Sequence, residues 1–223
     1  MKKFLIGMFL NTWTNIQRYN KRDIMAQLKF FYGTMGSGKT TELLKMADIY
    51  ERKDIEIAII KPIIDDRNGK QEGWGTIESR LVSSPSKRAY YFKNIVSEVT
   101  NKIPFEMLFV DEAQFLSSND IKELTTYVDT YNIDVYCYGL KNDSTGRMFS
   151  GSRELMTVAD ECIEMKNLCQ HSGCRNPANY HLRLIDGVVD RSPIPIMIEK
   201  GNVTYKSLCR KHYMKEMNIN SRD

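Results

Sequence analysis

The sequence of 223 residues lacks several features that define broad classes of protein. No apolar run is long enough to cross a membrane, so the sequence predicts no membrane-spanning segment. No dense basic stretch occurs and the net charge is only +4, which gives no argument for nucleic-acid binding. With 42% hydrophobic and 27% charged residues, the composition is that of a globular protein. The length suits one large domain, or one domain with a small appendage.

The N-terminus lacks the complete features of a signal peptide. A basic start is followed by an apolar stretch at residues 4–10, but this stretch is short and residues 11–13 offer no small-residue cleavage site. A second methionine, Met25, lies just before the first predicted strand. We therefore expect residues 1–24 to be a poorly ordered extension, or an upstream start that is absent from the working protein.

The most informative motif is a glycine-rich loop between a predicted strand at 28–32 and a predicted helix at 41–52. It fits the pattern G-x-x-x-x-G-K-[ST], in which backbone N–H groups and the helix start bind phosphate. The lysine can reach the β- and γ-phosphates, and the final hydroxyl can hold Mg²⁺. We predict that a nucleoside triphosphate, ATP, binds here through Gly33, Thr34, Met35, Gly36, Ser37, Gly38, Lys39 and Thr40.

Strands and helices alternate through the first two thirds of the chain, which predicts an α/β fold. Further strands are expected at 55–60, 107–110 and 134–140, helices at 91–101 and 118–131, and a polar loop region at 66–88. This order predicts a P-loop (RecA-like) parallel sheet flanked by helices on both faces.

Two acids, Asp111 and Glu112, directly follow the strand predicted at 107–110. Ligands bind at the carboxyl edge of a parallel sheet, so these acids should lie near the glycine-rich loop. Successive side chains of a strand alternate in direction. One acid can therefore serve Mg²⁺ while the other faces an acceptor.

The pattern changes near residue 166, after which short runs suggest β-hairpins. Four regions are expected: an extension (1–24), a nucleotide-binding α/β domain (25–166), a zinc-binding β lobe with a loop (167–216) and a flexible tail (217–223). Two knuckle-like pairs predict a structural, tetrahedral zinc site, formed by Cys169, Cys174, Cys209 and His212.

The remaining cysteine and histidine positions leave one alternative for the metal ligands. His171-x2-Cys174 is a more closely spaced pair that competes with Cys169-x4-Cys174. Cys137, in a predicted strand, and Cys162, in a predicted helix, are expected to be core residues rather than ligands.

Four motifs in order resemble those of the cellular-type (type II) thymidine kinases, in the bacterial and phage branch. They are the glycine-rich loop, Lys61-Pro62-x2-Asp65-x-Arg67, the Asp-Glu-Ala-Gln-Phe run at 111–115, and Cys209-Arg210-Lys211-His212. The resemblance extends from about Met25 to Tyr213. It implies transfer of the γ-phosphate of ATP to the 5′-hydroxyl of thymidine, with Mg²⁺ and structural zinc. It also implies a cytoplasmic homotetramer with thymidine triphosphate as a feedback ligand.

The resemblance also implies roles for individual residues. Glu112 matches the catalytic base, Thr40, Asp65 and Asp111 match positions near Mg²⁺, and Asp111 and Gln114 are assigned to phosphate binding. Arginines that help to organise the active site are matched by Arg67 and Arg183. Residues of the nucleoside pocket, including a lasso-like loop that closes over the base, are matched by Met35, Phe115, Leu140, Phe149, Ile196, Ile198 and Tyr205.

Three positions depart from the family pattern on the nucleoside side. Ser144 stands where relatives carry an aromatic residue, His181 replaces a small hydroxyl residue, and Glu199-Lys200 replace part of an Ile-Gly-Gly run. These departures bear on the selectivity for the nucleoside more than on phosphate transfer.

Two other functions compete with that of a kinase. A zinc-containing P-loop ATPase acting with nucleic acid predicts a second motor domain or a basic tract, and the sequence offers neither. A non-catalytic nucleotide sensor is disfavoured because Glu112 and the metal-side acids are retained.

Overall fold

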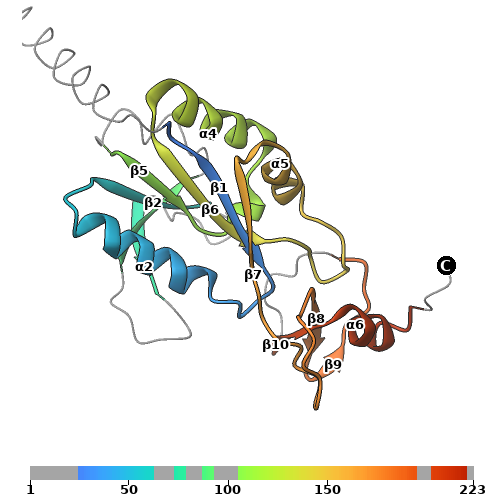
Figure 1. The fold of residues 1–223 in the computed structure, drawn as a ribbon. Coiled ribbons are helices and arrows are strands. Elements are labelled where there is room, and N and C mark those ends of the chain that lie inside the picture. Colours follow the sequence, from blue (N-terminus) through green and yellow to red (C-terminus); the bar gives the residue numbers. More distant parts are fainter. Residues whose placement is uncertain (1–24, 63–72, 79–86, 93–104, 195–201, 220–223) are drawn as a thin grey trace, which may run out of the picture.

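A computed structural model describes residues 25–62, 73–78, 87–92, 105–194 and 202–219. Within these ranges the chain forms a seven-stranded sheet and a three-stranded sheet (Figure 1). The predicted extension at 1–24 lies outside the described residues. None of the described helices has the length and apolar character needed to span a membrane.

The large sheet is parallel except at one edge. Its strand order is β3-β4-β2-β5-β6-β1-β7, and only the β3–β4 pair is antiparallel. All the strands except β3 therefore run in the same direction, and their carboxyl ends lie along one edge of the sheet. The strands are β1 (Leu28–Gly33), β2 (Ile57–Pro62), β3 (Gly73–Ile77), β4 (Lys87–Phe92), β5 (Met107–Val110), β6 (Asp134–Leu140) and β7 (Glu161–Met165).

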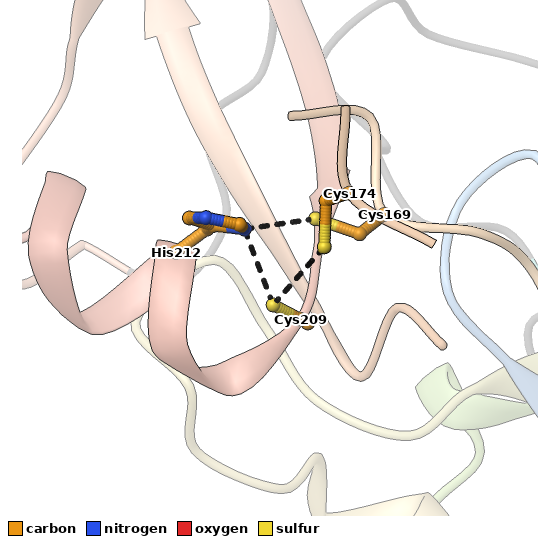
Figure 2. A group of neighbouring side chains, drawn as sticks. All are labelled: Cys169, Cys174, Cys209 and His212. Carbon is orange, nitrogen blue, oxygen red and sulfur yellow. Dashed lines mark hydrogen bonds between the residues drawn. The ribbon is translucent and has the colours of Figure 1, made fainter. Parts of the chain in front are cut away.

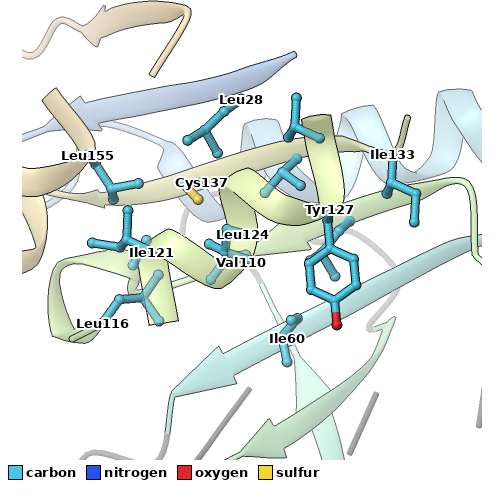
Figure 3. Packing of buried hydrophobic residues seen from close by; sticks show 14 of the residues in the cluster. Leu28, Ile60, Val110, Leu116, Ile121, Leu124, Tyr127, Ile133, Cys137 and Leu155 are labelled. Carbon is cyan, nitrogen blue, oxygen red and sulfur yellow. The ribbon is translucent and has the colours of Figure 1, made fainter. Parts of the chain in front are cut away.

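Helices cover both faces of this sheet, as the strand–helix alternation predicted. One face packs on α2 (Lys39–Glu51), and the other on α4 (Ser118–Tyr131) and α5 (Ser150–Val158) (Figure 1). Strand β5 shows the period of two: Leu108 and Val110 join the core beneath α4, whereas Met107 and Phe109 join the core beneath α2. Figure 3 shows the first of these cores, in which Leu124 and Leu155 pack against Val110 and Cys137.

The prediction of a loop at 66–88 is wrong for the residues of this range that the structure describes. Residues 73–77 form β3, which pairs with β4 in the register Gly73↔Tyr91 to Ile77↔Lys87. Glycines at 73 and 75 lower the strand propensity of this segment, but the outermost strand needs only one partner. The helix predicted at 91–101 is also wrong at its start, because Tyr91 and Phe92 belong to β4. Its remainder lies outside the described residues.

Cys162 differs from its prediction in both structure and burial. It lies in β7 rather than in a helix, and its side chain is exposed rather than buried. The reason is topological: β7 is an edge strand that pairs only with β1. Cys137, by contrast, is fully buried in β6 as predicted.

The chain after β7 forms a small C-terminal lobe, comprising the segment 167–179, a three-stranded sheet and a short helix. The sheet contains β8 (Tyr180–Ile185), β9 (Val188–Val189) and β10 (Val203–Leu208), and α6 (Arg210–Glu216) packs on it. Figure 1 shows this lobe beyond the lower end of β7. The Tyr213 hydroxyl of α6 donates to the Ser144 carbonyl at 2.8 Å, which attaches the lobe to the loop after β6.

A glycine near the start of α5 sets the distance between this helix and the segment that follows β5. A Cβ atom at Gly151 would lie 2.7 Å from the carbonyl oxygens of both Gln114 and Leu116. These contacts are with backbone, which cannot rotate away. The residue at 151 must therefore be glycine if α5 is to pack where it does.

We predict that Gly151→Ala destabilises the protein by about 1–2 kcal/mol. Alanine gains up to about 1 kcal/mol of helix propensity, but overpacking against backbone costs about 1–3 kcal/mol. Urea unfolding followed by circular dichroism measures the difference. Ser150→Ala, at the exposed preceding position, is the control and should change stability little. Equal or greater stability of Gly151→Ala would contradict the packing argument.

Candidate functional site

The glycine-rich loop (residues 33–40, hereafter the phosphate loop) joins the end of β1 to the start of α2. Gly36 and Gly38 have φ angles of +73° and +84°, a region that glycine enters without strain. A Cβ atom at Gly33 would lie 2.5 Å from the Met165 carbonyl oxygen and 2.6 Å from the Ser37 hydroxyl. The motif glycines are thus required by conformation or by close packing.

Lys39 spans the phosphate loop. Its ammonium donates to the Thr34 carbonyl at 2.8 Å and, more weakly, to the Ser37 hydroxyl at 3.4 Å. Burial lowers the pKa of Lys39 to about 8, although Glu112 and Asp111 nearby favour its charged form. An anion in the loop would stabilise this buried cation further. Thr40, the predicted Mg²⁺ ligand, follows it in the first turn of α2.

Asp111 stands at the carboxyl end of β5, and its main-chain N–H donates to Ile60 of β2 at 2.9 Å. Burial, together with the charge of Glu112, raises the pKa of Asp111 to about 6, while Lys61 and Lys39 act in the opposite direction. A buried carboxylate beside a phosphate site is the oxygen donor that Mg²⁺ prefers. The residue therefore fits its predicted place near the metal.

Glu112 adopts a left-handed backbone conformation, with φ +53°, just before the 3₁₀ turn η1 (Ala113–Phe115). Such a conformation is uncommon outside glycine and marks a position that its surroundings hold in place. The side-chain amide of Gln114 supplies part of that restraint, since it donates to Glu112 Oε2 at 2.6 Å. The carboxylate is thereby oriented at the sheet edge.

Gln114, which was predicted to contribute to phosphate binding, makes two side-chain hydrogen bonds within the protein. Its side chain is buried, and its Oε1 accepts from the Leu140 main-chain N–H at 2.9 Å while its Nε2 serves Glu112. A Cβ atom at Gly139 would lie 2.8 Å from Oε1, so this glycine makes room for the amide. The side chain of Gln114 thus links β6 to Glu112, and its predicted part in phosphate binding stays a prediction.

The residues predicted to line a nucleoside pocket are only partly brought together. Phe115 and Phe149 meet edge-on, with ring centroids 5.6 Å apart. Leu140 ends β6 beside Gln114, and Met35 lies in the phosphate loop. Tyr205 lies on β10, where its ring contacts His181 at a centroid distance of 6.1 Å. Predicted site residues that lie outside the described residues are Asp65, Arg67, Ile196 and Ile198.

Arg183 was predicted as a substrate-binding residue, but all its described contacts lie within the C-terminal lobe. It is fully buried, pairs with Asp190 at 2.6 Å and donates to the Ser192 hydroxyl and the Ile194 carbonyl. The guanidinium therefore fixes the segment 190–194, which leads toward the predicted lasso-like loop. Its Nη1 has no hydrogen-bond partner among the described residues, and its part in substrate binding stays a prediction.

His181 is buried on β8 and faces the phosphate loop. Burial lowers its pKa to about 4, and the positive charge of Lys39 acts in the same direction. At neutral pH the imidazole is uncharged. It lines a depression between the sheet edge and the lobe, together with Tyr32, Thr34, Lys141 and Glu164 among others. The structure thus places this departure from the family pattern close to the phosphate loop.

Three cysteines and a histidine of the C-terminal lobe converge on one point (Figure 2). The ligand atoms of Cys169, Cys174, Cys209 and His212 all lie within 4.8 Å of one another. His212 Nδ1 is 3.4 Å from the Cys169 sulfur and 3.3 Å from that of Cys209, and the Cys174 and Cys209 sulfurs are 4.0 Å apart.

These separations fit a tetrahedral metal site. Zinc–sulfur bonds of about 2.3 Å place tetrahedral ligands roughly 3.8 Å apart, and a Cys₃His donor set is typical of structural zinc. His171, the alternative ligand considered from spacing, is not in the cluster; its ring stacks on His212 at 3.8 Å. Of the two candidate pairs, the cluster therefore contains the one with the longer sequence spacing, Cys169-x4-Cys174.

Comparisons with known sequences agree with one another. A family model described as "Thymidine kinase" matches residues 26–213. The thymidine kinase of Shewanella oneidensis is 37% identical over 194 residues, which cover 85% of this chain and 97% of that protein. That of Pasteurella multocida is 36% identical over 198 residues, covering 86% and 99%. That of Streptococcus pyogenes serotype M3 is 37% identical over 195 residues, covering 85% and 97%.

The raised pKa of Asp111 predicts a pH-dependent gain of stability in Asp111→Asn. A folded-state pKa of about 6, above the ordinary value of about 3.9, means that stability is lost as pH rises from about 4 to about 6. Without nucleotide or Mg²⁺, we expect the variant to melt roughly 5 °C higher than wild type at pH 7.5. The difference should shrink toward pH 4.

Differential scanning fluorimetry across this pH range measures the effect. Asp129→Asn, which removes an exposed acid from α4, is the matched control and should show no such trend. A melting difference that is constant with pH would show that Asp111 does not carry the proposed electrostatic cost.

Proposed function

The chain belongs to the thymidine kinase family, and from this premise we propose that it transfers the γ-phosphate of ATP to the 5′-hydroxyl of thymidine. The products are ADP and thymidine monophosphate. The observation that carries the proposal is the juxtaposition at one sheet edge of the phosphate loop, Asp111 and a carboxylate, Glu112, held by Gln114. A loop alone would serve any nucleotide-binding protein, whereas the restrained carboxylate supplies a base.

Glu112 is assigned as the general base. A carboxylate in hydrogen-bond reach of the 5′-hydroxyl accepts its proton as the hydroxyl oxygen attacks the γ-phosphorus. The bond between that phosphorus and the β–γ bridging oxygen breaks, and ADP leaves. The hydrogen bond from Gln114 occupies one carboxylate oxygen of Glu112. The other oxygen remains to accept the proton of the substrate hydroxyl.

Lys39 and the loop N–H groups stabilise the negative charge of the transferring phosphoryl group. Burial lowers the pKa of Lys39 because it disfavours the charged ammonium group. An anion bound beside this ammonium would stabilise its charged form. Mg²⁺ would be held near Thr40, Asp111 and Asp65, where it would supply charge neutralisation of the β- and γ-phosphates.

The C-terminal lobe is assigned a structural zinc ion bound by Cys169, Cys174, Cys209 and His212. A small lobe buries few apolar side chains, so a metal would supply much of its folding free energy. All four positions are protein ligands, which leaves none for catalysis.

The nucleoside side of the proposal rests on the family resemblance. The residues that remain predictions for substrate binding are Met35, Arg67, Phe115, Leu140, Phe149, Arg183, Ile196, Ile198 and Tyr205. The homotetramer, the cytoplasmic location and inhibition by thymidine triphosphate are likewise predictions. Nucleic-acid-dependent ATPase activity is the alternative, and stimulation of ATP hydrolysis by DNA or RNA without thymidine would favour it.

Glu112→Gln tests the assignment of the base. We expect turnover with ATP, Mg²⁺ and thymidine to fall by about 10²–10⁴, while the Kd for ATP stays within about threefold of wild type. Chromatography of thymidine monophosphate measures the first quantity and calorimetry the second. Glu123→Gln, at an exposed position of α4, is the control and should retain full turnover. Undiminished transfer by Glu112→Gln would remove this residue as the base.

Zinc binding is tested separately by metal content. Purified protein should carry about one zinc ion per chain, and Cys209→Ser should lose most of it because a ligand is removed. We also expect the variant to melt at a lower temperature. Cys162→Ser, which replaces the exposed cysteine outside the cluster, should keep both metal and melting temperature. Retention of zinc by Cys209→Ser would refute the assigned ligand set.

A further inference from the structure

The C-terminal lobe is hydrogen-bonded to the phosphate loop at the main-chain carbonyl oxygen of Met35. The Ser207 hydroxyl donates to this oxygen at 2.7 Å, and the side-chain amide of Asn167 donates to it at 3.1 Å. A carbonyl oxygen has two lone pairs, so these bonds use its accepting capacity. Both donors belong to the lobe, and the acceptor lies within the phosphate loop.

The two donors occupy equivalent places relative to the metal cluster. Asn167 comes two residues before Cys169, and Ser207 comes two residues before Cys209. The two segments are also joined through Gln170: its N–H donates to the Ser207 carbonyl at 2.8 Å, and its side-chain oxygen accepts from the Ser207 N–H at 2.7 Å. A metal that holds Cys169 and Cys209 together would therefore fix the separation of the two donors.

Fixing the Met35 carbonyl also fixes the direction of the next amide. In a trans peptide group, the carbonyl oxygen and the following N–H lie on opposite sides. Because the Met35 oxygen is bonded to the lobe, the Gly36 N–H points away from the lobe. Loops of this kind bind phosphate through such N–H groups. Gly36, at φ +73°, has no side chain to restrict this peptide, and the two bonds from the lobe supply a restraint that this residue lacks.

We propose that Ser207 and Asn167 are positioning residues that couple the metal cluster to the phosphate loop. Zinc bound in the lobe and nucleotide bound in the loop then stabilise each other. The coupling rests on the proposed function, since it takes ATP as the ligand of the loop. Coupling of two binding equilibria is reciprocal: if zinc favours ATP by some factor, ATP favours zinc by the same factor.

The first test measures ATP affinity in variants that lose a donor. For Ser207→Ala and for Asn167→Ala we expect the Kd of MgATP, measured by calorimetry, to rise about fivefold each, as for loss of one hydrogen bond. Zinc content and melting temperature should stay close to those of wild type. Thr204→Ala removes an exposed hydroxyl from the same strand, β10, and should leave the Kd unchanged. Unchanged MgATP affinity in both donor variants would overturn the coupling.

The second test reads the coupling from the metal and needs no turnover. Zinc affinity is measured by competition with a chromophoric chelator, with and without saturating MgATP. In wild type and in Thr204→Ala, MgATP should tighten zinc binding by about fivefold, and in Ser207→Ala and Asn167→Ala this effect should be largely lost. A purely structural role for these two residues would weaken zinc binding without changing its response to MgATP.

The outcomes separate this inference from the proposed function. If wild type binds MgATP but its zinc affinity does not respond, the coupling is overturned and the kinase proposal stands. If MgATP tightens zinc equally in wild type and in both donor variants, the two residues are not the link. If wild type binds no MgATP at all, the proposed function is overturned and the coupling with it.

Discussion

The parallel arrangement of the large sheet is the constraint on which the rest of the molecule depends. Parallel pairing of β2, β5, β6, β1 and β7 brings the carboxyl ends of these strands to one edge. The phosphate loop, the acids after β5, the loop after β6 and the C-terminal lobe all leave the sheet from that edge. Because both sheet faces are covered by helices, this edge is where polar groups can gather without disturbing either core.

At this edge the protein keeps charges in surroundings that disfavour them. Burial lowers the pKa of Lys39 and raises that of Asp111, so it disfavours the charged form of each side chain. Opposite charges nearby offset some of this cost, and bound MgATP would offset more. The site is therefore less stable empty than filled, which favours binding of a polyanion with its metal. Neutral His181 adds no charge to this balance.

Sequence patterns identified the parts of the site that depend on local chain chemistry. The phosphate loop, the acids at the end of β5 and the cysteine–histidine pairs were all found because spacing along the chain fixes their geometry. Patterns failed where partners are distant in sequence. Gln114 is tied to Leu140, and Cys162 is exposed only because β7 lies at an edge, and neither fact is encoded near the residue itself. The strand β3 was not predicted because glycines, such as those at 73 and 75, are more typical of loops than of strands.

The lobe is attached to the body of the protein through main-chain acceptors. Tyr213 donates to the carbonyl of Ser144, and Ser207 and Asn167 donate to that of Met35. Every residue type offers the same carbonyl, so the attachment does not depend on which side chains stand at positions 35 and 144. A substitution at either position would keep the acceptor atom of the hydrogen bond. The lobe is therefore held by the backbone of the loops that follow β1 and β6, and its attachment does not require a particular residue type there.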